Sequence, residues 1–181
     1  MFRGVAALNR ACIFRQGQQA EILQKVSFLT TFQMSEARGI SNNGFITGIG
    51  TTTSRLGFGQ SRGFVRSPGG LIATALIPDS DGLYVGSFGN KINSSGFAVG
   101  RVVRNDGGTT AALWNEDGHL AFLTLQNVDG LSLIAALTDA VDINDNGNIL
   151  VKGSINGEAH AFVLRPNTGG VINFWPVSQS Y

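Results

Sequence analysis

The chain repeats one turn motif three times at nearly constant spacing. The copies read GISNNGFITG, KINSSGFAVG and DINDNGNILVKG, and they start at residues 39, 91 and 142. Their turn glycines, Gly44, Gly96 and Gly147, are 52 and 51 residues apart. Asn or Ser early in such a turn can bond its own backbone, and a closing Gly accepts a positive φ without steric cost. Each copy therefore predicts a strand, a tight turn and a second strand.

A second series of segments alternates with the first. Its copies read ACIFRQGQQAEIL, RGFVRSPGGLIATAL, AALWNEDGHLAFLTL and HAFVLRPNTGGVINF. We align them on Cys12, Gly63, Ala112 and Ala161, which are 51, 49 and 49 residues apart. In each copy turn residues separate two apolar runs, as in a hairpin. Two hairpins in a period of about 50 residues amount to four short strands, the content of a propeller blade.

The repeat predicts an all-β fold, a propeller-like array of about three and a half four-stranded units, with a β-solenoid or a sandwich as the alternative. We divide the single domain, 1–181, into a partial unit 1–34 and units 35–84, 85–134 and 135–181. The first unit is partial because residues 1–10 are too few to hold a hairpin of the first series. Two stretches, 20–32 and 131–141, have helical propensity, but their place in the repeat favours strands.

Apolar residues occupy both faces of the first strand in each copy of the second series. One face is predicted to hold Ile13, Phe64, Leu113 and Phe162, and the other Phe14, Val65, Trp114 and Val163. A strand that is buried on both faces must lie between two layers. This pattern predicts that neighbouring sheets stack on one another.

The composition limits the classes of partner. Charged residues make up 14% of the chain, against roughly 25% in typical soluble domains. The net charge is +1 with no basic run, which argues against nucleic acid as a partner. No apolar window is long enough for a membrane span, and the N-terminal apolar run is too short for a signal peptide. The lone Cys12 predicts no internal disulfide and no cysteine metal site.

The segment from Ile143 to Pro166 resembles the unit of the bacterial HAF-repeat proteins. That unit reads roughly IN-x-x-G-x-x-x-G, a short loop, HAFLW and a G turn, and HAF stands here from His160. Weaker copies run from about Ala11 to Phe174, with RGF or AAL in place of HAF. The resemblance implies a repetitive, exported bacterial protein, often with several copies in a longer chain. It brings no catalytic residue with it.

The segment from residue 142 also resembles the start of an EF-hand loop, which needs oxygen ligands at positions 1, 3 and 5 and a Glu at 12. The candidate calcium ligands are Asp142, Asn144 and Asn146. Positions 9 and 12 are Leu150 and Gly153, which offer no side-chain oxygen. In the other copies Gly39 and Lys91 replace the aspartate. The motif is therefore a turn, and we predict neither a metal nor another cofactor.

Few residues are candidates for binding or catalysis. Tyr84 and Trp175 fall outside the repeated apolar positions and are the candidate binding residues, because aromatic anchors dominate many contacts. Trp114 occupies a repeated apolar position and is predicted to be core. His119 and His160 have no acid or cysteine at catalytic spacing, so we predict no catalytic residue.

These observations favour a non-catalytic β-repeat module that presents loops to a protein or a polysaccharide, in an extracellular or cell-surface setting. The alternative is a glycan-active hydrolytic β-propeller, whose acids would come from loops of different units. Strand edges left unpaired at both ends of the array predict a homodimer through the terminal blades or, as the alternative, an open arc that aggregates.

Overall fold

The computed structural model describes residues 10–26, 30–54, 57–75, 77, 82–124 and 135–166. These residues form an all-β fold of four antiparallel sheets, and none of them lies in a helix. The prediction of an all-β chain is confirmed. The described residues accordingly contain no helix long and apolar enough to cross a membrane.

The sheets follow one another along the chain, and in each the strands lie in sequence order. The first sheet pairs β1 (Cys12–Ile13) with β2 (Glu21–Ile22). The second contains β3 (Gln24–Val26), β4 (Thr30–Ile40), β5 (Ile46–Ser54), β6 (Gly57–Arg66) and β7 (Ile72–Thr74). The third contains β8 (Tyr84–Ile92), β9 (Ala98–Arg104), β10 (Thr109–Trp114) and β11 (Leu120–Phe122). The fourth contains β12 (Ala135–Ile143), β13 (Ile149–Ile155) and β14 (Glu158–Leu164).

Most described residues of the two stretches with helical propensity lie in strands, and none of them lies in a helix. Residues 20–32 contribute β2, β3 and the start of β4, and residues 131–141 contribute most of β12. The first stretch supplies edge strands of the first and second sheets, and the second stretch supplies the first strand of the fourth sheet. The preference for strands over helices is confirmed there, because sheet pairing and burial outweigh intrinsic propensity.

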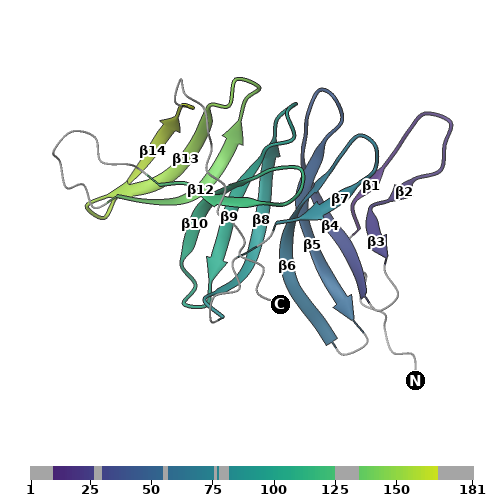
Figure 1. The fold of residues 1–181 in the computed structure, drawn as a ribbon, viewed down its shortest axis with the longest axis horizontal. Coiled ribbons are helices and arrows are strands. Elements are labelled where there is room, and N and C mark those ends of the chain that lie inside the picture. The colour runs from purple at the N-terminus through teal and green to yellow at the C-terminus, as the bar shows by residue number, and fades with distance from the viewer. Residues whose placement is uncertain are drawn as a thin grey trace.

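The sheets pack face to face in a row that opens like a fan (Figure 1). The first strand of each later sheet makes most of the contact: β8 packs on β4, β5 and β6, and β12 packs on β8, β9 and β10. An apolar cluster fills each of the three interfaces. Buried members are, in order along the row, Leu23, Met34 and Phe64, then Val65, Ile92 and Trp114, then Leu113, Leu137 and Val151.

Strand pairing changes the alignment of the second repeat series. In β6, β10 and β14, respectively, Arg66, Trp114 and Leu164 pair with the first residue of the preceding strand. Trp114 is therefore equivalent to Arg66 and not to Val65. Its side chain packs toward the second sheet, while that of Leu113 packs toward the fourth.

The predicted assignment of Leu113 to the face of Phe64, and of Trp114 to the face of Val65, is wrong. The hairpin turns that follow β6 and β10 are 48 residues apart, whereas the predicted alignment used 49. A shift of one residue moves every side chain to the opposite face of its strand. Aligning the copies on their turns would have avoided the error.

Burial on both faces is confirmed for the two inner copies. Phe64 and Val65 are buried, as are Leu113 and Trp114. The same prediction is wrong for the outer copies, because Phe14 is 79% exposed and Val163 is 61% exposed. These two residues lie on the outer faces of the first and last described sheets, where no described sheet covers them.

The three turn glycines of the repeated motif have the predicted backbone geometry. Gly44, Gly96 and Gly147 have φ of 93°, 78° and 78°. We expect Gly44→Ala to lower the free energy of unfolding by about 1 kcal/mol, because an added side chain is strained at positive φ. A Cβ there would be 3.8 Å from Pro68, an ordinary contact, so the cost would come from the backbone. Urea unfolding measures it.

Gly69 provides the matched control for Gly44. It lies in the neighbouring turn of the same sheet, has no positive φ, and a Cβ there would meet nothing closer than 3.8 Å. Gly69→Ala should therefore leave the free energy of unfolding within about 0.5 kcal/mol of the parent. Equal stability of the two variants would contradict the turn assignment.

Charged side chains tie the N-terminal hairpin to the second sheet. Glu21 accepts hydrogen bonds from Arg15 at 2.7 Å and from Arg66 at 2.8 Å, and the Arg66 side chain is buried. The bond from Arg15 and the nearby Arg66 charge lower the pKa of Glu21. A carboxylate with a lowered pKa stabilises the fold above its ordinary pKa and loses that contribution as the pH falls through the folded value. Acid should therefore weaken this attachment.

Candidate functional site

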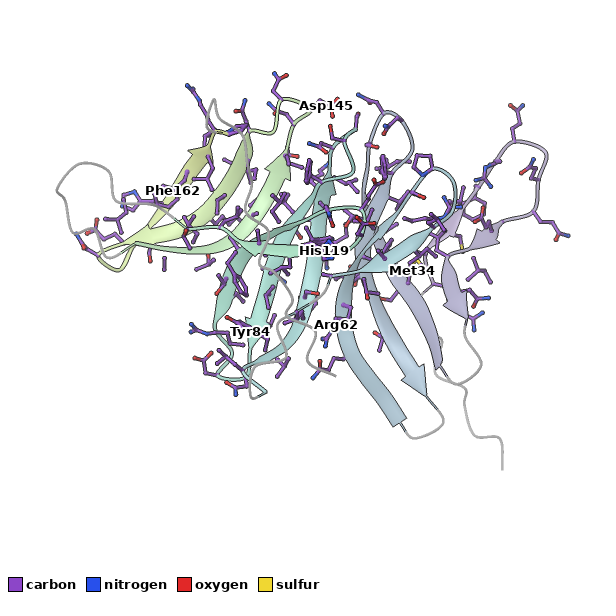
Figure 2. All side chains as sticks on the ribbon, in the orientation of Figure 1. Met34, Arg62, Tyr84, His119, Asp145 and Phe162 are labelled. Carbon is purple, nitrogen blue, oxygen red and sulfur yellow. The ribbon has the colours of Figure 1, made fainter. Side chains whose placement is uncertain are left out.

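One hairpin turn from each of three sheets lies in a row along one end of the molecule, and we call residues 41–44, 93–96 and 144–147 the turn row. The loops between β4 and β5, β8 and β9, and β12 and β13 lie at the upper edge of Figure 1. Figure 2 shows Asp145 at this edge. The turn row contains Ser, Asn, Asp and Gly only.

Each turn is held by a side chain from its own first residue. Ser41 Oγ accepts a hydrogen bond from the amide of the residue four positions on, at 3.0 Å. Asn93 Oδ1 and Asn144 Oδ1 accept the equivalent bonds at 3.0 and 2.9 Å. The backbone closes the same turns, since Gly44, Gly96 and Gly147 donate to the carbonyl three residues earlier. The Asn of the repeated motif is therefore a local turn residue.

Hydrogen bonds between turns join the row into one unit. Asn43 Nδ2 donates to the Ser94 carbonyl at 2.6 Å, and Asn93 Nδ2 donates to the Asn144 carbonyl at 3.3 Å. Asp145 Oδ1 accepts from the Ser94 amide at 2.8 Å. All three bonds connect residues that are 51 positions apart, close to one repeat. Sequence reasoning did not identify these contacts, although the repeat period itself was the signal for them.

A pocket of about 180 Å³ opens between the second and third turns of the row. Its floor is apolar and its rim carries amide, hydroxyl and carboxylate groups. The floor consists of Phe97, Leu113, Ile143 and Ile149, the rim of the exposed Ser95, Asp145 and Asn146, and the buried Asn93 with Gly147 and Pro166 completes the wall. Sites for whole small molecules usually enclose about 300 to 1,000 Å³. This pocket therefore fits one side chain or one ring of a longer ligand.

Two further acidic residues lie beside the second turn of the row. Glu116 and Asp117 lie in the turn between β10 and β11, and a Cβ at Gly96 would be 3.3 Å from Cβ of Glu116. That distance places the β10–β11 turn beside the turn row. Neither this turn nor the turn row contains Lys or Arg. The surface offers hydrogen-bond acceptors and amides, which suit hydroxyl and amide donors on a ligand.

The three calcium candidates lie in or next to the third turn of the row. Asp142 Oδ1 accepts from the Ile143 amide at 2.9 Å, and Asn144 Oδ1 closes the turn. Asn146 lies on the pocket rim. Among the described residues no three His, Cys, Asp or Glu side chains gather in a way that could hold a metal ion.

We expect no saturable calcium binding to this loop in the micromolar range. Positions 9 and 12 of the loop offer no side-chain oxygen, and Asn144 Oδ1 is already bonded within the turn. Isothermal titration calorimetry with calcium chloride is the measurement. A saturable heat that Asp142→Ala abolishes would overturn this expectation.

The aromatic candidates are not in the turn row. Tyr84 is half-buried, stacks on Phe122 with ring centroids 5.2 Å apart, and lies at the opposite end from Asp145 in Figure 2. Trp175 lies outside the described residues. Trp114 is fully buried between the second and third sheets, as predicted.

Both histidines are exposed and lie on different sheets. His119 follows the β10–β11 turn, and His160 lies on β14 with its ring 6.2 Å from that of Phe162. In the described part of the chain neither imidazole has an ion-pair or hydrogen-bond partner. The structure therefore brings no acid or nucleophile to either histidine among these residues.

The chain was compared with protein-family models, with curated proteins and with solved structures, and it matches none of them significantly.

Proposed function

We propose that this chain is a non-catalytic β-repeat module of the HAF-repeat kind that presents its turn row to a protein or a polysaccharide outside the bacterial cell. Its architecture is a propeller-like array of about three and a half four-stranded units, divided as the repeat predicts. The motif from Ile143 to Pro166 supports the family and the exported setting. Successive antiparallel sheets that stack face to face, with β8 on the second sheet and β12 on the third, support the propeller-like arrangement.

The observation that carries the binding role is the row of turns joined by hydrogen bonds between sheets. Because these turns are fixed to one another before a ligand arrives, little ordering entropy is lost on binding. The pocket supplies one apolar notch, with Phe97 and Leu113 in its floor, beside polar groups on the rim. A chain-like ligand that places one ring or side chain in the notch and its polar groups along the row would satisfy both features.

Binding to an array of immobilised bacterial polysaccharides and peptides tests the proposal. Asn146→Ala should weaken the binding about tenfold, which corresponds to about 1.4 kcal/mol. Asn146 is exposed on the rim, and its side chain bonds to no described residue, so the fold should be unaffected. Glu158→Ala, on exposed β14 away from the pocket, should leave the binding unchanged.

Two results would count against the proposal. Binding that is insensitive to Asn146→Ala would remove the turn row as the binding surface. Release of reducing ends from a bound polysaccharide would favour the alternative of a hydrolytic β-propeller. The Glu158→Ala protein serves as the matched control in both assays.

A further inference from the structure

The two ends of the row of sheets expose opposite halves of the interface that is used inside the molecule. Each sheet has a forward face, which points to the next sheet along the chain, and a backward face, which points to the previous one. Inside the row a forward face always meets a backward face. Figure 1 shows β14 and β2 at opposite ends of the row.

The last described sheet leaves its forward face open. Val65 on β6 and Leu113 on β10 are each 1% exposed, whereas their equivalent Val163 on β14 is 61% exposed. On the second strands, Val99 is fully buried and its equivalent Leu150 is 42% exposed. Leu150 and Val163 pair directly across β13 and β14 and so share this face. The apolar positions of this face are exposed in the last copy, whereas the equivalent positions of the other copies are buried.

The first described sheet leaves its backward face open. Ala11, Gly63 and Ala111 are equivalent, because each carbonyl accepts from the amide twelve residues later at 2.9 Å. Three residues further along, Phe14 therefore corresponds to Arg66 and Trp114. Their exposed fractions are 79% for Phe14, 7% for Arg66 and 0% for Trp114. Phe14 occupies the position from which Trp114 packs toward the preceding sheet.

Polar groups at the forward end repeat the same pattern. Arg101 pairs with Asp139 of the next sheet at 3.2 Å, but its equivalent Lys152 is exposed and forms no ion pair with any described residue. Asn93 Nδ2 donates to the next turn, but Nδ2 of its equivalent Asn144 finds no acceptor within the described ranges. The forward face thus has both the apolar patch and the donors of an internal interface.

We propose that a second copy of this chain docks head to tail on the fourth sheet, with its Phe14 on the first copy's Leu150 and Val163 in the way that Trp114 meets Val65. Unlike faces then meet, as they do at every interface inside the molecule. A heterologous contact of this kind either closes into a ring or continues as a filament. The inference is independent of what the turn row binds.

Light scattering on a sizing column, with the full 181-residue chain at tens of micromolar, tests the proposal. We expect assemblies larger than a monomer. Val163→Lys and Phe14→Lys should each give monomers, with the dissociation constant raised at least about tenfold. Leu71→Lys changes an equally exposed apolar residue away from both faces and should still assemble. Far-UV circular dichroism checks that each variant is folded.

Mixing the two lysine variants distinguishes head-to-tail docking from symmetric packing of two fourth sheets and from strand-edge pairing. The Val163→Lys chain keeps an intact Phe14 end, and the Phe14→Lys chain keeps an intact Val163 end, so the mixture should form a dimer of one copy of each. If Phe14→Lys assembles like the parent chain while Val163→Lys does not, two fourth sheets pack symmetrically and the proposal is wrong. A parent chain that stays monomeric, or association that survives both substitutions as strand-edge pairing would, also overturns it.

Discussion

Replacing Trp114 with alanine is expected to lower the free energy of unfolding by about 4 kcal/mol, the usual range for a buried aromatic being about 3 to 5 kcal/mol. The indole is fully buried in the interface between the second and third sheets. A Cβ at Gly63 would be 2.8 Å from its ring, and one at Gly100 would be 3.1 Å away, so two glycines leave the space that it fills. Urea unfolding followed by circular dichroism is the measurement.

Two further variants keep the Trp114 result interpretable. Trp114→Phe should cost less, because the ring is mostly retained and an indole nitrogen with no hydrogen-bond partner among the described residues is removed. Leu71→Ala should change the free energy of unfolding by less than about 0.5 kcal/mol, since Leu71 is 79% exposed. A Trp114→Ala protein as stable as Leu71→Ala would contradict the stacked-sheet packing.

Gly100→Ala is expected to cost about 3 kcal/mol or more, because the added Cβ would overlap the backbone carbonyl oxygen of Phe88. β8 bulges between Gly89 and Lys91, directly beside the residue that pairs with Gly100. Backbone atoms cannot rotate aside as a flexible side chain can. Either the bulge or the pairing of β8 with β9 must therefore shift.

Gly48 is equivalent to Gly100 and faces the carbonyl of Glu36 beside the matching bulge in β4. Gly48→Ala should therefore cost a similar amount, and Gly69→Ala in an open turn should cost almost nothing. The same urea titration measures all three variants. Tolerance of alanine at both Gly48 and Gly100 would show that the bulges are not where the structure places them.

These two glycines are the second Gly of the repeated motif, and the sequence alone could not explain their presence. The motif predicted a turn at the first Gly, where the cause is local: a positive φ and a hydrogen bond from its amide to the carbonyl three residues earlier. The second Gly lies against a backbone carbonyl of the neighbouring strand, that of Glu36 for Gly48 and that of Phe88 for Gly100. Val151 holds the third copy of this position, beside the corresponding bulge of β12 between Ala140 and Asp142, and is fully buried in the interface with the third sheet.

The candidate site was predicted only in part, for the same reason. Asn144 and Asn146 were identified as oxygen-bearing turn residues, and they lie in the turn row. The pocket also needs Phe97 and Leu113 from the neighbouring sheet, which no local pattern connects to them. Tyr84, selected because it fell outside the repeated apolar positions, is packed against Phe122.

By itself the sequence determined the all-β class, the hairpins of the repeated motif and the positive-φ turns of this protein. Each depends on interactions within about five residues, namely turn hydrogen bonds, backbone φ and alternation along a strand. The tertiary structure alone decided which face of β10 carries Trp114, where a carbonyl of the neighbouring strand leaves room only for glycine, and which turns form a pocket. It also decided that Phe14 and Val163 are exposed while their counterparts are core. Those outcomes depend on which sheet covers which face. The local sequence of a repeat is similar whether or not a neighbouring sheet covers its residues.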